Sequence, residues 1–266
     1  MISSAMRESD LEPTQPRPSA LYVHDDLTDL VAARHGPGSP AARHLEGLFA
    51  LLRGEPGRIA VLALEPQYAA VLGTPPPAPY AQAVAVGRAG ARVAARLHAR
   101  AGWFPVVRTV DLTREEDGDG GYEVVRRGAG SLAADLRDLA GAASLAIVDD
   151  TVFSGVTVRA VLEALPDNAR ARAHVVCLRG VAETLAELAR ERPVRAGFAA
   201  PGRLLDEVSL INATGLVLRG SIRRRGRADL AFFERPQWMR AWFGEAAEAV
   251  IGHCRALSAE LAGETL

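Results

Sequence analysis

The amino-acid sequence predicts an α/β fold with a central, mainly parallel sheet flanked by helices. Short apolar runs with β-branched members, among them Ala83–Val86 and Leu145–Val148, have the composition of strands that are buried on both faces. Stretches with helical apolar spacing separate these runs, and small-residue turns follow two of them. In such a fold, ligands bind at the carboxyl ends of the strands.

Length and composition limit the possible functions. The chain has 266 residues, of which 48% are hydrophobic, enough for one large domain or two small ones with a sizeable core. The formal net charge of −1 indicates no general attraction to nucleic acid or to an anionic membrane. There is no apolar run of about 18 residues, so we expect no membrane span.

The N-terminal sequence and the cysteines together predict a cytoplasmic protein. The first residues lack the apolar core of a signal peptide, and only two cysteines occur, Cys177 in an apolar run and Cys254 on an expected helix. The chain also lacks lysine, because all 31 basic residues are arginine. Catalysis by a Schiff-base lysine or by a P-loop lysine is therefore excluded.

The first third of the chain is expected to begin with a loosely draped tail over residues 1–18, which is rich in proline and polar residues. A strand and a helix are predicted within Leu21–Ala33, with Asp25, Asp26 and Thr28 as candidate caps. An amphipathic helix over Ala41–Leu52 and a strand over Arg58–Leu64 follow, and then a proline-rich loop over residues 74–79.

The middle of the chain reads as strand Ala83–Val86, a glycine turn, and a helix over Ala91–Arg100. Two strands, Phe104–Leu112 and Tyr122–Arg127, are expected to form a long hairpin around the acidic, glycine-rich loop Thr113–Gly121. A helix capped by Ser131 should extend to Ala140. From residue 145 to residue 199, a β-α-β-α-β order predicts parallel strands with right-handed crossovers.

The stretch Leu145–Thr157, LAIVDDTVFSGVT, carries the strongest chemical signal. A buried strand leads to Asp149 and Asp150, and a turn rich in hydroxyl groups then leads into a helix. Backbone N–H groups at a helix N-terminus bind phosphate, and glycine at position 155 lets the backbone approach a ligand. Carboxylates repel phosphate but accept hydrogen bonds from vicinal hydroxyls, so the pattern suits a sugar phosphate. The alternative is an ordinary strand-turn-helix with a capping aspartate.

The whole pattern resembles the phosphoribosyl pyrophosphate (PRPP) signature of type I phosphoribosyltransferases. The turn Gly87-Arg88-Ala89-Gly90 resembles the pyrophosphate loop of the same family, mainly through its position one strand-helix unit earlier, although it could also be a plain tight turn. The resemblance implies PRPP binding by Gly87, Arg88, Ala89, Gly90, Asp149, Asp150, Thr151, Val152, Phe153, Ser154, Gly155, Val156 and Thr157, with catalytic roles for Asp149, Asp150 and Arg88.

The family transfers the phosphoribosyl group of PRPP to a small-molecule acceptor and releases pyrophosphate, with Mg²⁺ carried mostly by PRPP rather than by protein ligands. Two departures from the family pattern reduce the number of acceptor molecules that the resemblance allows. In 6-oxopurine enzymes the fifth loop position is a carboxylate base, whereas here it is Phe153, and orotate enzymes use a loop lysine that this chain lacks. The acceptor could still be adenine-like or a molecule other than a nucleobase. The alternative function is a non-catalytic regulator on the same fold that senses PRPP or a nucleotide.

The resemblance also implies an organisation of the chain. We expect the tail over 1–18, a helical segment over 19–53, a phosphoribosyltransferase-like core over 54–202, and a C-terminal hood with a terminal helix over 203–266. In the family a mobile loop in the interval Thr113–Gly121 closes over the substrates, so Arg114, Arg126 and Arg127 could reach a pyrophosphate. A homodimer is possible, and neither nucleic acid nor a membrane is an expected partner.

Overall fold

The computed structural model describes residues 21–55, 58–73, 76, 78–116, 122–127, 130–200 and 210–262. The tail expected over residues 1–18 lies outside these ranges. The chain divides into two compact units. Unit 1 comprises Met1–Leu64, Glu115–Glu123 and Leu205–Leu266, and unit 2 comprises Glu65–Arg114 and Val124–Leu204.

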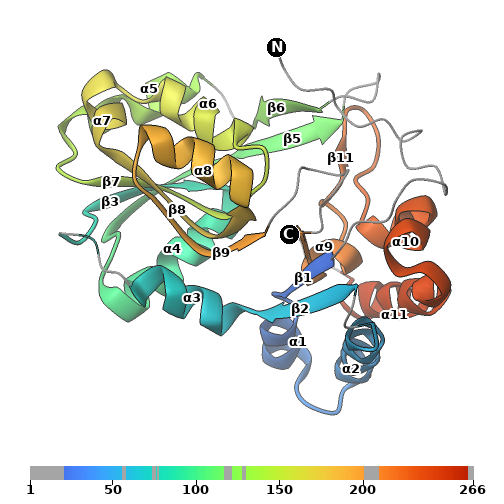
Figure 1. Ribbon diagram of the computed structural model, residues 1–266. Helices are drawn as coiled ribbons and strands as arrows, with labels where there is room; N and C mark the ends of the chain where they lie inside the picture. Colours follow the sequence, from blue (N-terminus) through green and yellow to red (C-terminus); the bar gives the residue numbers. More distant parts are fainter. Residues whose placement is uncertain are drawn as a thin grey trace. The chain divides into compact units, whose positions relative to one another are not determined.

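Unit 2 is built on a five-stranded sheet with the order β4-β3-β7-β8-β9 (Figure 1). Every neighbouring pair in this sheet is parallel, so the predicted α/β fold class with a mainly parallel sheet is confirmed. The strands are β3 (Gln82–Val86), β4 (Val106–Val110), β7 (Leu145–Val152), β8 (Ala173–Val181) and β9 (Val194–Ala200).

Helices cover both faces of this sheet. Leu145 and Ile147 of β7 belong to an apolar cluster with residues of α5, α6, α7 and α8, whereas Ala146 and Val148, which alternate with them, point to the opposite face. There α4 packs on β3 and β7, and the backbone of Gln67 in α3 lies against β9. The helices are α3 (Leu64–Gly73), α4 (Gly87–Ala101), α5 (Leu132–Leu136), α6 (Val156–Ala164), α7 (Asp167–Arg172) and α8 (Ala182–Glu191).

Two of the expected elements differ in the structure, and one helix, α3, is not among the predicted elements. α4 begins at Gly87, so the glycine turn expected before the helix forms its first turn. The helix capped by Ser131 changes to a 3-10 helix at Arg137, and α3 has no counterpart among the predicted elements. α3 escapes prediction because its amphipathic pattern is weak and a proline, Pro66, stands in its first turn, where proline is tolerated.

The close approach of α4 to β7 depends on Gly90. A Cβ atom at this position would lie 2.4 Å from the carbonyl oxygen of Val148, which belongs to the central strand and cannot move aside. The absence of a side chain therefore allows the first turn of α4 to rest directly on the strand that carries the acidic pair.

Replacing Gly90 by alanine should lower the free energy of unfolding by about 1–3 kcal/mol, as expected for overpacking in a core. A matched control is Gly252→Ala, at an exposed helical glycine with open space around its Cβ position. The control should raise stability by about 0.5–1 kcal/mol. Urea denaturation of both variants measures the difference, and a Gly90→Ala protein as stable as the wild type would contradict the close packing.

A second sheet, with the order β11-β5-β6, corrects the predicted hairpin. Instead of one strand over Phe104–Leu112, the chain forms β4 and then β5 (Leu112–Glu116), so part of the expected loop Thr113–Gly121 is a strand. Residues 117–121 lie outside the described ranges. The other strands of this sheet are β6 (Tyr122–Arg126) and β11 (Arg223–Arg224).

Pairing of charges explains why the acidic sequence of β5 forms a strand. β11 runs parallel to β5, with Arg224 in register with Glu116. The Glu116 carboxylate lies 2.7 Å from the guanidinium of the buried Arg235, and Glu123 forms an ion pair with Arg225. The charges that predicted a solvated loop are thus partly neutralised by arginines that are distant in the sequence.

Unit 1 contains a three-stranded parallel sheet with the order β10-β1-β2. The sequence predicts a core that starts at residue 54, but the structure pairs β2 with β1 in this unit. The strands are β1 (Leu21–Asp25), β2 (Ile59–Ala63) and β10 (Leu210–Asn212), and the helices are α1 (Thr28–His35), α2 (Pro40–Arg53), α9 (Ala213–Val217), α10 (Pro236–Phe243) and α11 (Ala247–Glu260). The role of the chain ends as a hood remains a prediction.

Aromatic side chains of α10 form much of the core of unit 1. Trp238, Trp242 and Phe243 are buried among residues of α2 and α11. Of the candidate caps, Asp25 accepts a hydrogen bond from the Thr28 amide at the start of α1. Asp26 instead accepts one from the Thr214 amide at the start of α9, so it does not cap the helix for which the sequence predicts it. Within the described ranges, no helix combines the length and apolar character that crossing a membrane requires.

Candidate functional site

The acidic pair lies near the carboxyl end of the central strand of unit 2. The sequence predicts that this strand ends at Val148, but β7 continues through Asp149 and Asp150 to Val152 because it stays paired with β8. β3 runs beside β7 with Ala85 in register with Val148. Since α4 starts directly after β3, the structure brings the Gly87–Gly90 segment next to the acidic pair.

The turn after β7 reverses direction at Gly155. This residue has φ +72°, in the left-handed region that favours glycine, and a Cβ atom would lie 3.1 Å from Thr184 Cγ2. α6 begins at the next residue. Neither α6 nor α4 receives a side-chain cap at its N-terminus from the residues that the structure describes. Two sets of helix N–H groups near the acidic pair are therefore free of side-chain caps.

The hydroxyl groups of the turn differ in their surroundings. Ser154 is exposed, Thr157 is half-buried, and the Thr151 hydroxyl is buried without a hydrogen-bond partner in the described part of the chain. Leaving a buried hydroxyl unsatisfied is unfavourable. A bound oxygen atom at this turn would satisfy it.

Arg179 holds one carboxylate of the pair. This arginine lies on β8 in register with Thr151, its side chain is only 1% exposed, and its guanidinium is 3.1 Å from Asp150 Oδ2. Arg179 was not among the site residues expected from the sequence. The available signal was an arginine at the end of the apolar run HVVCL, which predicts a buried charge once that run is taken as the neighbouring strand.

Asp149 is in a different electrostatic environment from Asp150. Burial, and then the adjacent Asp150 carboxylate, raises the pKa of Asp149 well above the usual range of an aspartate. One Asp149 oxygen accepts a hydrogen bond of 2.8 Å from the Asp150 amide. Cys177 lies in register with Asp149 on β8, and burial raises the pKa of its thiol, so Cys177 is a core residue.

The arginines predicted to bind pyrophosphate have different surroundings in the structure. Arg114 lies over the Phe153 ring of the turn, with its guanidinium carbon 5.3 Å from the ring centroid. Arg126 forms an ion pair with Asp135 and donates to the Gly130 carbonyl, so this arginine is engaged within its own hairpin region. Arg88 is exposed in the first turn of α4.

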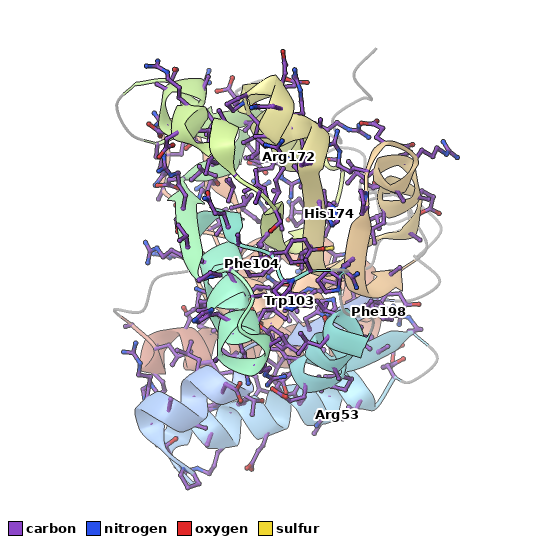
Figure 2. All side chains as sticks on the ribbon, turned by 90° about the vertical axis from the view of Figure 1, so that its left-hand side faces the viewer. Arg53, Trp103, Phe104, Arg172, His174 and Phe198 are labelled. Carbon is purple, nitrogen blue, oxygen red and sulfur yellow. The ribbon has the colours of Figure 1, made fainter. Side chains whose placement is uncertain are left out.

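A second polar cluster lies at the opposite, amino-terminal edge of the same sheet, where Figure 2 shows Trp103, Phe104 and His174 gathered. The Tyr80 hydroxyl is 2.9 Å from His174 Nδ1, and Arg195 donates to this hydroxyl at 3.2 Å. Burial, and then the Arg195 charge, lowers the pKa of His174, which favours a neutral imidazole as acceptor. The cluster closes this end of the core and contains none of the predicted site residues.

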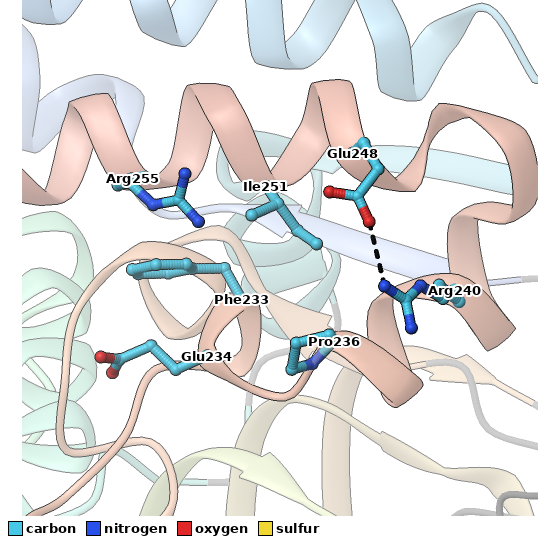
Figure 3. A pocket seen from close by; sticks show the side chains of 7 residues that line it. All are labelled: Phe233, Glu234, Pro236, Arg240, Glu248, Ile251 and Arg255. Atoms are coloured by element: carbon cyan, nitrogen blue, oxygen red, sulfur yellow. Dashed lines mark hydrogen bonds and ion pairs between the residues drawn. The ribbon is translucent and has the colours of Figure 1, made fainter.

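A shallow pocket of about 350 Å³ occurs in unit 1 (Figure 3). Its lining includes an ion pair of 3.3 Å between Arg240 and Glu248. The remaining lining residues are Phe233, Glu234, Pro236, Ile251 and Arg255. Among the described residues no group of three or more His, Cys, Asp or Glu side chains could hold a metal ion, in this pocket or elsewhere.

No family model and no curated protein matches the sequence. Solved structures do match. They include the AQ2163 protein from Aquifex aeolicus, with 18% identity over 47% of this chain and 56% of that chain and a TM-score of 0.36. The match therefore spans little more than half the length of that protein.

Two further similar structures are of proteins with a stated activity or ligand. A purine phosphoribosyltransferase from Pyrococcus horikoshii matches with 17% identity over 61% of this chain and 78% of that chain, at a TM-score of 0.28. A hypothetical protein from Neisseria gonorrhoeae with bound ppGpp matches with 16% identity over 61% and 81%, at a TM-score of 0.34. At this identity the matches assign no role to any residue of this chain.

Proposed function

We propose that this protein transfers the 5-phosphoribosyl group of PRPP to a nucleophilic small-molecule acceptor and releases pyrophosphate. The observation that carries the proposal is the juxtaposition of Asp149 and Asp150 with two uncapped helix N-termini at adjacent strand ends of one parallel sheet. PRPP has an anionic group at each end and a diol between them, which matches anion sites on either side of a carboxylate pair.

In the proposed reaction, a lone pair of the acceptor forms a bond to the anomeric carbon of PRPP. The bond from that carbon to the pyrophosphate oxygen breaks, and pyrophosphate leaves with the electron pair. The N–H groups of the Gly87–Gly90 turn and the guanidinium of Arg88 stabilise the negative charge that develops on the leaving group. The acceptor, if protonated, loses its proton to solvent.

The ribose and its 5-phosphate are held on the β7 side of the site. The Asp150 carboxylate, oriented by Arg179, accepts hydrogen bonds from ribose hydroxyls together with Asp149. The 5-phosphate binds in the Thr151–Thr157 turn, where the buried Thr151 hydroxyl gains a partner. Mg²⁺ carried by PRPP would be bound mostly by substrate oxygens and would neutralise part of the pyrophosphate charge.

A regulator that senses PRPP or a nucleotide without turnover is the second candidate. Phe153 favours this regulator. It stands at the loop position where 6-oxopurine enzymes carry a carboxylate base, and its side chain cannot take a proton. Such a protein would use the same ribose and phosphate contacts and would differ only in lacking an acceptor reaction.

Binding and turnover together test the proposal. Titration calorimetry of the full chain with PRPP in the presence of Mg²⁺ should show one saturable site, and pyrophosphate release should require an acceptor from a panel of heterocycles or a cellular extract. Saturable binding without release for any acceptor would favour the regulator. Failure to bind PRPP would refute both the transferase and a PRPP sensor, and would leave only a nucleotide sensor.

A further inference from the structure

We propose that Phe153 and Arg114 form an acceptor platform that selects planar acceptors bearing a carboxylate. This inference rests on the proposed function and assigns the acceptor class of the same site. It concerns Phe153, which stands where 6-oxopurine enzymes carry a carboxylate base, and Arg114 on β5 in a chain without lysine.

The geometry of unit 2 directs Arg114 toward the turn after β7. Residues two apart on a strand share a face, so Arg114 lies on the same face of β5 as Leu112. Leu112 is buried in the apolar cluster that also contains Val152, the residue directly before Phe153. The Arg114 guanidinium carbon then lies 5.3 Å from the Phe153 ring centroid, within the range of a cation–π contact.

Arg114 also acts on the acidic pair. Its positive charge opposes the rise in the pKa of Asp149, which places the guanidinium within electrostatic reach of that carboxylate. Arg108 on β4 and Arg126 on β6 form ion pairs with Asp138 and Asp135. Of these three arginines, Arg114 is the one that lies over the Phe153 ring, where it can influence what binds beside the ribose.

The chemistry of this pair favours an anionic, flat acceptor. A guanidinium is planar, remains protonated, and can donate two parallel hydrogen bonds to one carboxylate. Without Arg114, the carboxylates of Asp149 and Asp150 would repel an anionic acceptor. An aromatic acceptor can pack against the Phe153 ring beside Arg114, and a ring nitrogen with a free lone pair needs no base, which agrees with Phe153 at this position.

Arg114 could instead bind pyrophosphate, but its position argues against this role. The Gly87–Gly90 turn follows β3, whereas Phe153 belongs to the turn after β7 that leads into α6. Through its cation–π contact with Phe153, Arg114 lies at the turn expected to bind the 5-phosphate and ribose. A group presented there meets the acceptor side of the ribose rather than the leaving group.

Acceptor pairs that differ by a carboxylate and have a ring nitrogen with a free lone pair test the inference: nicotinate against nicotinamide, and imidazole-4-carboxylate against imidazole. With the wild-type protein and PRPP–Mg²⁺, both binding by calorimetry and kcat/KM for pyrophosphate release should favour the carboxylated member of at least one pair. Arg114→Gln should lower kcat/KM or affinity for that member by about 10- to 100-fold and leave the neutral member and the affinity for PRPP unchanged.

Two further variants complete the test. Phe153→Leu should weaken both members of a pair because the stacking surface is lost, and Arg108→Gln, at an arginine paired with Asp138, should change neither. The inference is overturned if the wild-type protein binds both members equally or binds neither, or if Arg114→Gln weakens PRPP or pyrophosphate instead of the acceptor. Absence of PRPP binding in the wild type would instead refute the proposed function.

Discussion

Replacing Arg179 by methionine should lower the free energy of unfolding by about 3–5 kcal/mol, the usual cost of breaking a buried ion pair from one side. The Arg179 side chain is 1% exposed and that of Asp150 18%, so water cannot replace the lost guanidinium effectively. Methionine has a similar length and keeps most of the packing. The loss therefore arises mainly from the Asp150 carboxylate that remains without its cation.

Chemical denaturation of Arg179→Met, Asp150→Asn and the double variant checks this prediction. The double variant should recover most of the stability lost by Arg179→Met, because no buried charge is left unpaired. Arg159→Met is a matched control, since Arg159 forms its ion pairs with Glu187 and Glu191 at the surface, where such pairs contribute about 0–1 kcal/mol. Equal losses for Arg179→Met and the control would contradict a buried pair.

Asp149→Asn and Asp150→Asn should each weaken PRPP binding by about 10- to 100-fold, which corresponds to the loss of a charged hydrogen-bond partner for a ribose hydroxyl. Asparagine keeps the size and one carbonyl acceptor of the side chain but removes the charge. Calorimetry with PRPP–Mg²⁺ measures the change. If both variants bound PRPP with wild-type affinity, the acidic pair would not be the group that binds the ribose hydroxyls.

The same Asp149→Asn change should stabilise the fold without ligand at neutral pH. The pKa of Asp149 is raised in the folded state, so its protonated form stabilises the fold at low pH. That contribution is lost as pH rises from about 3.9, the value in an unfolded chain, through the raised value in the fold. The side-chain amide of the variant does not titrate, so the stability of the wild type relative to the variant should fall as pH rises through this window.

Thermal melting at several pH values separates the two effects of Asp149. The variant should have the higher Tm at neutral pH, and the difference should shrink as the solution is made acidic. A variant that melts below the wild type at neutral pH would show that the ionised carboxylate is well solvated in the fold. A carboxylate kept in spite of a cost in stability is expected at a binding site.

The sequence by itself determined the features that depend only on residues close together in the chain. The apolar runs Ala83–Val86 and Leu145–Val148 became adjacent parallel strands, and the Asp-Asp and Thr/Ser/Gly order placed the acidic pair before an uncapped helix. A strand, a turn that needs glycine and a helix start are each specified within a few residues. The fold class and the candidate residues of the proposed ribose and phosphate sites therefore follow from the sequence.

Tertiary structure alone decided which distant residues complete the site. Arg179 meets Asp150 because β8 lies beside β7, and Arg114 meets Phe153 because β5 presents one face to the same core cluster. Neither pairing has a local signature, since an arginine on a strand is equally compatible with solvent until its neighbours are known. Sheet order and strand register fix these contacts, and burial then gives each charge its effect on the site.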